Sequence, residues 1–262
     1  MSRDGVIGAS VAAYEPKAYG EVWAAEYDEL FPAGPNVEEI ATFVTDFAAG
    51  GRVLEFGIGS GRVALELAPR GVEVHGIDAS QAMVERLRSK PGGADIPVVI
   101  GDMTSVRVNG EFAVVLLVFN TIFALPTQDA QIACFRNAAR HLAEEGVFVI
   151  ECFVPDPARF DRGQRVQARD ITDDEVRLDV AEHDPTTQTI RSALVRLRET
   201  GTRILPVTLR YAWPSELDLM GRLADLRLLA RWGGWRRQPF SASSTSHVSV
   251  YTPTMRPAGG QV

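Results

Sequence analysis

The chain has 262 residues, of which 45% are hydrophobic and 23% are charged, so it has enough apolar material for a large soluble core. Its formal charge of −7 argues against a nucleic-acid or anionic-membrane partner, because both require concentrated positive charge. The opening residues MSRDGVIGAS lack the apolar run of a signal peptide, and no run reaches membrane-spanning length, so a cytoplasmic protein is expected.

The first part of the chain is predicted to be helical after a disordered start. Residues 1–12 are small and polar and have no period, which predicts disorder. Residues 14–31 are rich in aromatic side chains, and Tyr19, Trp23 and Tyr27 recur every four residues. On a helix these three rings would form one stripe.

From residue 53 the chain alternates between apolar strands and helices. Unbroken apolar runs such as FAVVLLVF and GVFVIECF are typical of a parallel sheet that is covered on both faces. The alternation predicts an α/β fold, a doubly wound sandwich. Strands are expected at 53–56, 72–77, 98–100, 112–119 and 146–153, and helices at 37–47 (with Asn36 as N-cap), 61–68, 80–88 and 127–141.

The pattern changes after Pro155. Residues 164–212 contain four stretches of roughly alternating polarity, which predict a small antiparallel sheet laid over one edge of the sandwich. A helix with Ser215 as N-cap and a closing antiparallel pair, LRLLARWGGWR and HVSVYTP, should follow. An exposed edge strand of the β insertion could pair with the same strand of another subunit, so a homo-oligomer is possible. We divide the chain into an N-terminal helical segment, a cofactor-binding core, the insertion and a C-terminal part, at 1–35, 36–154, 155–213 and 214–262.

Residues 53–80, VLEFGIGSGRVALELAPRGVEVHGIDAS, contain the first functional signal. A strand runs into three glycines and a helix, a junction that offers backbone N–H groups and a helix N-terminus to a ligand. The run from Gly59 to Ala64 fits the dinucleotide pattern G-x-G-x-x-A, and Asp78 lies near the expected distance of about 20 residues. An adenosine-containing ligand is therefore expected, either a dinucleotide or S-adenosylmethionine.

Three details favour S-adenosylmethionine. Glu55 precedes the glycines, where it would repel a pyrophosphate but attract the cationic amino group of a methionine moiety. The third strand ends in Asp102, which could accept from the adenine amino group while Met103 packs on the ring. The only lysines, Lys17 and Lys90, leave no Tyr-x-x-x-Lys pair in the α/β body, on which short-chain hydride-transferring enzymes depend.

These motifs resemble the first three motifs of class I S-adenosylmethionine-dependent methyltransferases over about residues 36–154. The resemblance implies a seven-stranded methyltransferase sheet with the antiparallel insertion after its fifth strand. It also implies that Asp78 binds the ribose hydroxyls, that Asp102 and Met103 flank the adenine, and that the glycines line the methionine end. The implied cofactor-binding residues are Tyr19, Glu55, Gly57, Gly59, Gly61, Asp78, Ala79, Met83, Asp102, Met103 and Phe119.

The flanks are similar to a narrower bacterial subgroup, which includes the N-methyltransferases of amino sugars and of lincosamide antibiotics in secondary metabolism. In that subgroup a tyrosine of the N-terminal helix, and an aromatic residue or histidine after strand four, border the reacting methyl group. Tyr19 and Phe123 match these positions best, with Tyr27 close behind, and these three are the implied catalytic residues. Because Phe123 stands where some relatives carry histidine, a histidine base is not expected there.

The chemistry points to a small-molecule amine as substrate. Methyl transfer from a sulfonium mainly requires that the nucleophile, the methyl carbon and the sulfur lie in a line. An amine needs only to arrive unprotonated, whereas an alcohol would need a base or a metal ion to make it nucleophilic. No residues have metal-ligand spacing, and the four histidines are scattered. The expected activity is N-methylation of an amino-sugar or lincosamide-like amine in antibiotic biosynthesis, without a metal. O- or C-methylation, a nicotinamide-dependent oxidoreductase and a binding protein without catalysis remain alternatives.

Several of these residues also have a structural interpretation. The aromatic stripe could pin the N-terminal helix to the core, and the two phenylalanines after strand four could be core residues. Asp78 could be a helix cap. Arg62 could either orient the glycine loop or face solvent, and the sequence does not decide between these roles. His141, His247 and the run WRRQPF are expected to be structural or solvated.

Overall fold

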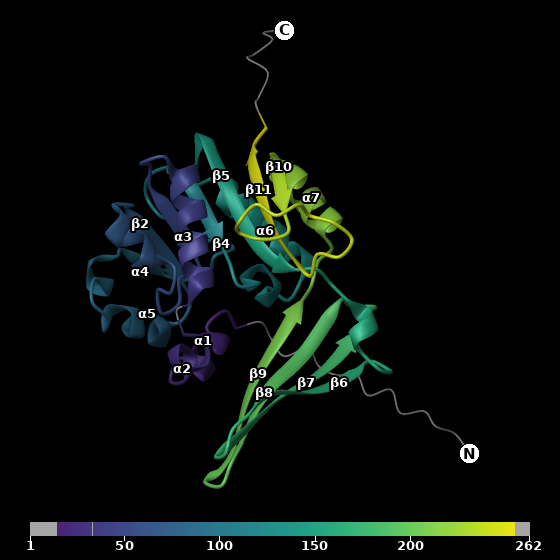
Figure 1. Ribbon diagram of the computed structural model, residues 1–262. Coiled ribbons are helices and arrows are strands. Elements are labelled where there is room, and N and C mark those ends of the chain that lie inside the picture. Colours follow the sequence, from purple (N-terminus) through teal and green to yellow (C-terminus); the bar gives the residue numbers. More distant parts are fainter. Residues whose placement is uncertain (1–14, 33, 255–262) are drawn as a thin grey trace, which may run out of the picture.

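Seven strands form one mixed sheet in the order β10-β11-β5-β4-β1-β2-β3 (Figure 1). The computed structural model describes residues 15–32 and 34–254, so the predicted disorder of residues 1–12 lies outside the described part. Strands β1 to β5 are parallel, and β11 runs antiparallel to both β5 and β10. The strands are β1 (Val53–Phe56), β2 (Val74–Asp78), β3 (Val98–Ile100), β4 (Phe112–Leu117), β5 (Leu142–Phe153), β10 (Leu226–Trp232) and β11 (Ser246–Pro253).

This order confirms the predicted methyltransferase sheet. The chain leaves β1 toward the β3 edge and then returns to β4 on the other side of β1. Loops at the carboxyl ends of β1 and β4 therefore diverge, which leaves room for a ligand between them.

Helices cover both faces of the sheet because successive strand residues point to opposite sides. Val114 and Leu116 of β4 pack with α3 and α4 on one face. Val115 and Leu117 pack with α6 and α7 on the other. The helices are α3 (Pro35–Ala48), α4 (Ala64–Leu67), α5 (Gln81–Arg88), α6 (Gln128–Ala139) and α7 (Pro214–Leu223), with short 3-10 turns η1 (Ala68–Arg70), η2 (Gly93–Asp95), η3 (Thr121–Ala124) and η4 (Pro157–Arg159).

Two predicted N-cap residues were wrong, both because a proline begins the helix. Helix α3 begins at Pro35 with Gly34 as its N-cap, so Asn36 lies inside the helix. Helix α7 begins at Pro214, so Ser215 is its second residue. Proline is well suited to the first helical position, because its missing N–H has no partner there and its φ is already helical.

The N-terminal segment forms two short helices instead of one. Helix α1 covers Ala18–Trp23 and α2 covers Tyr27–Leu30, with a turn between them. The aromatic residues still meet, because Tyr19 stacks on Trp23 with ring centroids 5.3 Å apart, and Tyr27 meets the edge of Tyr19 at 6.5 Å.

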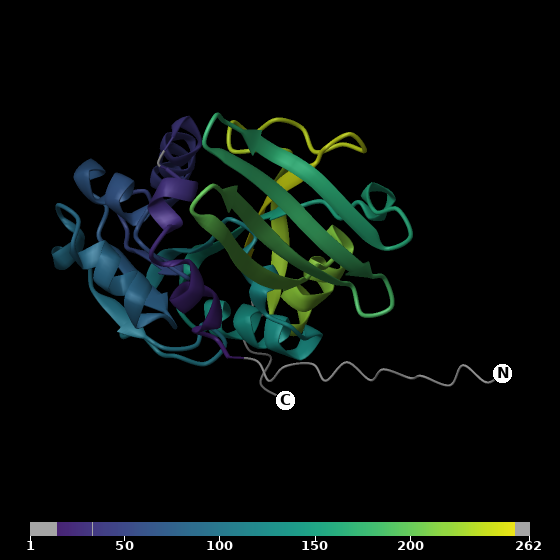
Figure 2. The ribbon, with the colours of Figure 1, turned by 90° about the horizontal axis from the view of Figure 1, so that it is seen from below.

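A second, four-stranded antiparallel sheet follows β5, as predicted. Its strands are consecutive in the chain and in space. It does not lie over an edge of the sandwich; it lies at the carboxyl ends of the parallel strands, where β9 contacts α1 and η3 (Figures 1 and 2). The strands are β6 (Gln164–Ile171), β7 (Glu175–Asp184), β8 (Thr189–Arg198) and β9 (Gly201–Arg210).

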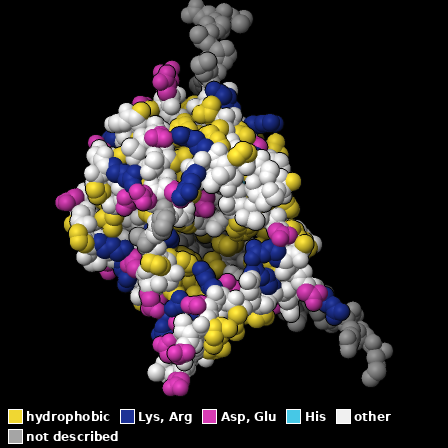
Figure 3. Space-filling model, in the orientation of Figure 1, with side chains coloured by type: hydrophobic (Ala, Val, Ile, Leu, Met, Phe, Trp, Pro, Cys, Tyr) yellow, Lys and Arg dark blue, Asp and Glu magenta, His cyan; other side chains and the backbone are white. Residues whose placement is uncertain are grey.

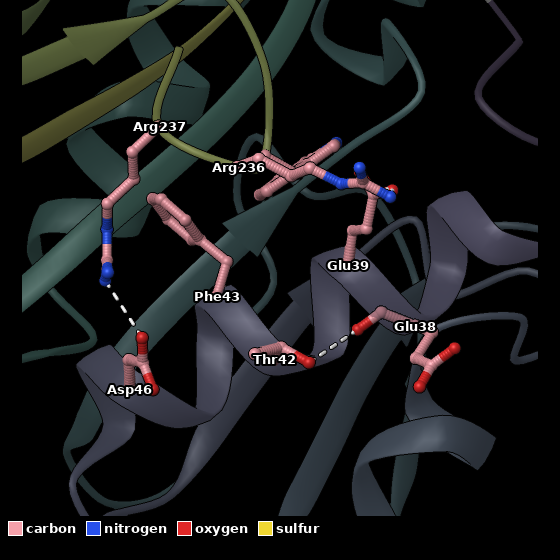
Figure 4. A pocket seen from close by; sticks show the side chains of 8 residues that line it. Glu38, Glu39, Thr42, Phe43, Asp46, Arg236 and Arg237 are labelled. Atoms are coloured by element: carbon pink, nitrogen blue, oxygen red, sulfur yellow. Dashed lines mark hydrogen bonds and ion pairs between the residues drawn. The ribbon is translucent and has the colours of Figure 1, made fainter.

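The run WRRQPF, expected to be a solvated turn, is anchored to α3. Arg236 pairs with Glu39 at 2.6 Å, and Arg237 pairs with Asp46 at 3.0 Å. These residues and Phe43 border a surface hollow of about 430 Å³ (Figure 4). None of the predicted site residues lines this hollow.

Across residues 15–32 and 34–254, no helix has the length and apolar character that crossing a bilayer would require.

Candidate active site

The glycine loop after β1 has a backbone that only glycine adopts easily. The φ angles of Gly57, Gly59 and Gly61 are 65°, 56° and 80°, in the left-handed region. A Cβ on Gly61 would lie 2.3 Å from a methyl of Leu87, so this glycine is needed for packing. A Cβ on Gly59 would meet nothing closer than 3.9 Å. Gly59 therefore presents bare backbone to open space, which suits a ligand that approaches closely.

Asp78 ends β2 and faces this loop. Its Oδ2 accepts a hydrogen bond from the Gly59 N–H at 2.7 Å, and its Oδ1 accepts from the Ser80 N–H at 2.8 Å. Ser80, not Asp78, is the N-cap of α5. An ionised carboxylate has about four acceptor positions, so two remain for a pair of ribose hydroxyls. Burial raises the pKa of Asp78, and the backbone N–H groups of Ser80, Gly59 and Ala79 oppose that shift.

Glu55 on β1 is buried, and its Oε2 has no hydrogen-bond partner. Burial raises the pKa of Glu55 to about 8, and the nearby Asp78 charge adds to the effect. A buried acceptor without a partner is costly unless a ligand satisfies it. A cationic amino group is the ligand that this carboxyl would stabilise most.

The third predicted acid also lies at the end of its strand. Asp102 follows β3, and its Oδ1 accepts from the Thr104 N–H at 2.8 Å. The buried Asn137 of α6 donates to the carbonyl of Met103 at 2.9 Å and to that of Val106 at 2.9 Å, which holds this loop in place. Strands β1, β2 and β3 are neighbours, so Glu55, Asp78 and Asp102 follow one edge of the carboxyl ends. This edge and the glycine loop fit the cofactor deduced from the sequence.

Aromatic rings from three elements form a cage beside the glycine loop. The N-terminal segment supplies four rings, in contact from Tyr19 through Trp23 and Tyr27 to Phe31. The chain after β4 supplies Phe119, which contacts the same Arg62 guanidinium as Tyr27 and Phe31. We call Tyr19, Trp23, Tyr27, Phe31 and Phe119 the aromatic cage.

Arg62 lies in this cage, which answers the question left open by its sequence position. Its guanidinium carbon is 4.1 Å from the ring centroid of Phe119 and 5.9 Å from those of Tyr27 and Phe31. Its Nε is buried without a hydrogen-bond partner. The faces of these rings therefore already accommodate a cation.

Both tyrosines of the cage are neutral at physiological pH. Burial raises the pKa of Tyr19 above its usual value, and Tyr27 raises it further. Burial also raises the pKa of Tyr27, which Arg62 partly opposes. Their hydroxyl groups can donate and accept hydrogen bonds, but neither is a phenolate base.

Polar contacts hold the N-terminal segment over the glycine loop. Asp28 accepts hydrogen bonds from Ser60 at 2.6 Å, from Arg86 at 2.8 Å and from Lys90 at 2.8 Å. These partners lower the pKa of Asp28 to about 2 against the opposing effect of its burial. A Cβ on Gly20 would lie 2.3 Å from that of Ser80, so α1 touches the start of α5 directly.

The structure does not place every predicted residue at the cage. Phe123 has no exposed surface and packs against Phe153 at 4.9 Å, inside the core under α6. The structure therefore does not bring Phe123 to the cage, whereas Phe119 is the ring after β4 that contacts Arg62 there, and the catalytic role of Phe123 stays a prediction. Met83 is buried with Trp23 in a cluster that joins α5 to α1. Ala79 lies between Asp78 and the N-cap of α5, partly exposed.

Two polar residues that sequence reasoning missed hold Phe119. Glu151 of β5 accepts from the Phe119 N–H at 2.6 Å, and Asn120 Oδ1 accepts from the Phe153 N–H at 2.6 Å. Phe119 and Asn120 both have positive φ, at 55° and 62°, a strain that functional sites often carry. Asn120 was the available signal in the sequence, because asparagine adopts positive φ angles more readily than most residues. Burial raises the pKa of Glu151, opposed by the Phe119 N–H and then by Arg62.

The histidines have structural partners. The Nε2 of His141 accepts from the Val108 N–H at 3.0 Å, at the amino end of the sheet, far from the cage. His247 is buried in β11 and shares a hydrogen bond with Ser249 at 2.9 Å. Within the described ranges, no group of three or more His, Cys, Asp or Glu side chains lies close enough to hold a metal ion.

Comparison with known proteins agrees with this geometry. A family model described as a methyltransferase domain matches residues 53–146. The CcbJ methyltransferase from Streptomyces caelestis is 39% identical, with 92% of this chain and 100% of that chain covered and a TM-score of 0.87. The cypemycin N-terminal methyltransferase from a Streptomyces species is 29% identical over 242 residues, which are 90% of this chain and 98% of that protein.

A third relative shares the fold at lower identity. S-adenosylmethionine-bound CalS10, an amino pentose methyltransferase from Micromonospora echinaspora, is 22% identical, with 92% of this chain and 100% of that chain covered and a TM-score of 0.67. The choice between a dinucleotide and S-adenosylmethionine is thus decided for the latter. The chain belongs to the class I S-adenosylmethionine-dependent methyltransferases, and among them it resembles the amino-sugar N-methyltransferases.

Proposed function

We propose that this methyltransferase transfers a methyl group to the nitrogen of a small-molecule amine, an amino-sugar or lincosamide-type intermediate of antibiotic biosynthesis. The observation that carries the proposal is the aromatic cage, which accommodates the Arg62 guanidinium and contains two neutral tyrosine hydroxyl groups. A cage of this kind stabilises a nitrogen that becomes cationic when it gains a methyl group.

The chain's own residues would bind and orient the cofactor. Glu55 would hold its amino group, Asp78 its ribose hydroxyls, and the open side of Gly59 would allow its close approach. When bound, S-adenosylmethionine supplies a methyl group on a cationic sulfur that a nitrogen lone pair can displace. The cage and the N-terminal segment then have one main task, which is to align that lone pair and exclude water.

The state of the tyrosines favours an amine over an alcohol. Because the pKa values of Tyr19 and Tyr27 are raised, neither hydroxyl can take a proton from a weakly acidic alcohol. Either hydroxyl can still accept a hydrogen bond from an amine N–H and so aim its lone pair. The amine must therefore enter unprotonated, so the rate should depend on pH through the pKa of the amine.

The side of the second sheet that faces the cage supports a polar substrate. Arg169 lies over the Phe31 ring at 5.6 Å and pairs with Asp179 at 3.6 Å. Gln167 stands opposite Asp179 on the same side of the sheet. These groups can bind hydroxyls and ring oxygens of a sugar-like substrate. Figure 3 shows a hollow between this sheet and the sandwich, with hydrophobic and basic side chains gathered around it.

Two of the relatives support the same reaction. One acts on the N-terminus of cypemycin and another is an amino pentose methyltransferase, so both printed activities are consistent with an amine acceptor.

A matched set of substrates tests the proposal. The purified protein would be incubated with S-adenosylmethionine and pairs of amino sugars and the corresponding sugars with hydroxyl in place of the amine, and the products identified by mass spectrometry. We expect methyl transfer to the amino member of a pair and none to its partner. Transfer to both members or to the hydroxyl alone would support O-methylation instead. Cofactor binding without transfer to any amine would contradict the proposed reaction.

A further inference from the structure

The inner face of the second sheet, turned toward the cage, has polar side chains on its edge strand β6. Directly opposite residues in an antiparallel sheet share a face, so the strand register sorts the side chains. Leu194 packs in the same cluster as Trp23, which places it on the inner face. Gln167 stands opposite Asp179, and Asp179 stands opposite Leu194, so Gln167 belongs to the inner face as well.

Two arginines flank Gln167 on this face. Arg165 lies two residues before Gln167, so both side chains point to the same side of the strand. Arg169 follows beyond a bulge in β6, and its guanidinium carbon lies 5.6 Å from the ring centroid of Phe31 in the cage. Val166, between them, points to the outer face and is 69% exposed, and Figure 2 shows that face turned away from the sandwich. We call Arg165, Gln167 and Arg169 the β6 row.

The β6 row has the dimensions of a clamp. Residues rise about 3.3 Å each along a strand, so the Cα atoms of Arg165 and Arg169 are about 13 Å apart. Their long side chains can both reach a group that lies over Gln167, whose amide adds a hydrogen-bond donor there. The row starts beside the cage at Arg169 and leads away from it. A group held by the row therefore belongs to a part of the substrate away from the reacting nitrogen.

The positive charge of the row is only partly balanced. The residues opposite Arg165 on β7 and β8 are Ala181 and Ser192, neither of which carries a charge. Asp179 pairs with Arg169 at 3.6 Å, which is longer than a hydrogen bond. The row thus has two guanidinium groups and one carboxylate beside it, in a chain with a formal charge of −7.

The cage adds a third guanidinium group, that of Arg62. Arg62 and Arg169 lie 5.9 Å and 5.6 Å from the centroid of the same Phe31 ring, so two like charges share one ring. Both also oppose the effect of burial on the pKa of Tyr19. Like charges held this close repel one another, and a bound anion relieves that repulsion. Three acids between the N-terminal segment and the second sheet are already bound by Arg196: Glu26, Glu29 and Glu175.

We infer that the β6 row binds an anionic group, a carboxylate or a phosphate, carried by the amine substrate. The inference rests on the proposed function, because it places the anion on the methyl acceptor. Guanidinium groups bind both kinds of anion through charge-assisted hydrogen bonds, often in pairs. The anion fixes one end of the substrate at β6 while the cage receives the nitrogen at the other end. Figure 3 shows basic side chains on the wall of the hollow that joins these two places.

A set of related ligands tests the inference by binding, without turnover. Isothermal titration calorimetry would compare glucosamine, its phosphate ester and the corresponding amino uronic acid, each added to protein saturated with S-adenosylhomocysteine. At low ionic strength the two anionic ligands should bind at least about tenfold more tightly than glucosamine. This preference should shrink as salt is added, because the row is open to solvent.

Variants of two arginines on opposite faces provide the control. Arg165→Gln should reduce the affinity for the anionic ligands by about tenfold and leave that for glucosamine within about twofold. Arg165→Lys keeps the charge and should keep part of the preference. Arg191→Gln makes the same change of charge on the outer face, where Arg191 is 69% exposed and pairs with Glu182 at 3.3 Å. This control should bind all three ligands as the wild type does.

Each outcome has a defined meaning, with circular dichroism to check that the variants are folded. No preference for either anionic ligand, or an equal preference in Arg165→Gln and Arg191→Gln, would overturn the inference. A loss of S-adenosylhomocysteine affinity in Arg165→Gln would assign the row to the cofactor's carboxylate and would overturn it as well. A preference for one anionic ligand alone identifies the anion. If no amine is methylated, the proposed function fails, while a preference that depends on Arg165 would still support the anion site.

Discussion

Asp78 and Gly59 are joined by a hydrogen bond of 2.7 Å from the Gly59 N–H to the Asp78 carboxylate. The acid that ends β2 therefore fixes the loop that follows β1, and a ligand held by Asp78 necessarily lies beside the open backbone of Gly59. Asp78 thus shapes the glycine loop, and we propose that its remaining acceptor positions bind the cofactor.

Replacing Asp78 with alanine should weaken the binding of S-adenosylhomocysteine by at least about tenfold, or about 1.4 kcal/mol. The ribose hydroxyls lose their acceptor and the glycine loop loses its tie. Isothermal titration calorimetry measures the change, with Asp129→Ala on the exposed start of α6 as the control. Equal affinity for the two variants would contradict the role of Asp78.

Cofactor binding should release a proton from Glu55. In the free protein the pKa of Glu55 is raised to about 8, so the carboxyl is protonated at neutral pH, and a bound ammonium group would favour the ionised form. Affinity should therefore fall as the pH decreases below 8. At about pH 6.5, where an α-amino group is still protonated, titrations in buffers of different ionisation enthalpy should give about one proton released. Glu55→Gln should release none, and equal release from both proteins would disprove the coupling.

Tyr19→Phe should slow turnover by about tenfold while leaving cofactor affinity nearly unchanged, because one hydrogen bond to the amine is lost. Since the pKa of Tyr19 is raised, its hydroxyl does not ionise near neutral pH. The rise of kcat/KM with pH should therefore follow the pKa of the substrate amine in both proteins, and a less basic amine should shift the midpoint downward. Unchanged turnover would return Tyr19 to a structural role.

Phe119 and Phe123 offer a matched pair of substitutions. Phe119→Leu removes a ring face from the cage and should lower kcat/KM with little loss of stability. Phe123→Leu leaves a cavity in the core and should lower the free energy of unfolding by about 1–3 kcal/mol, with the activity of the folded protein retained. Thermal unfolding and steady-state kinetics separate the two effects, and the reverse pattern would restore the catalytic prediction for Phe123.

Arg196 connects the cage to the second sheet. It is 1% exposed and binds Glu26, Glu29 and Glu175. Arg196→Met should destabilise the protein by about 1–3 kcal/mol and weaken cofactor binding, because the buried Glu175 loses one of its partners and the N-terminal segment loses its tie to the second sheet. Arg203→Met removes a pair at 3.0 Å that is largely solvated and should change stability by less than about 1 kcal/mol.

The same network predicts a dependence on pH. Arg196 holds the pKa of Glu175 at about 2, below its usual value near 4.5. The folded state therefore gains stability from Glu175 above pH 4.5 and loses it as the pH falls toward 2. Denaturant unfolding across this range should show a smaller acid-dependent loss in Arg196→Met than in the wild type.

The geometry of the proposed cofactor site could be predicted from the sequence because it is local. Glu55, the three glycines and Asp78 lie within 24 residues of one another, and a strand-loop-helix-strand unit places them at one end of a parallel sheet whatever surrounds it. The three acids at the ends of β1, β2 and β3 were identified for the same reason.

The substrate side required the tertiary structure. Which of Phe119 and Phe123 reaches the cage depends on two residues with positive φ, held by Glu151 and Phe153 from another strand. Arg62 enters the cage because rings from α2, from Phe31 just after it and from the chain after β4 meet there.

The sequence by itself determined that this protein is an S-adenosylmethionine-binding α/β sandwich with an antiparallel insertion, because strand, helix and glycine signals depend on neighbours in the chain. Only the tertiary structure decided where the insertion lies, which rings form the cage and which face of the second sheet remains apolar and exposed. Those features depend on contacts between residues such as Arg196 and Glu26, 170 positions apart, and no local period encodes them.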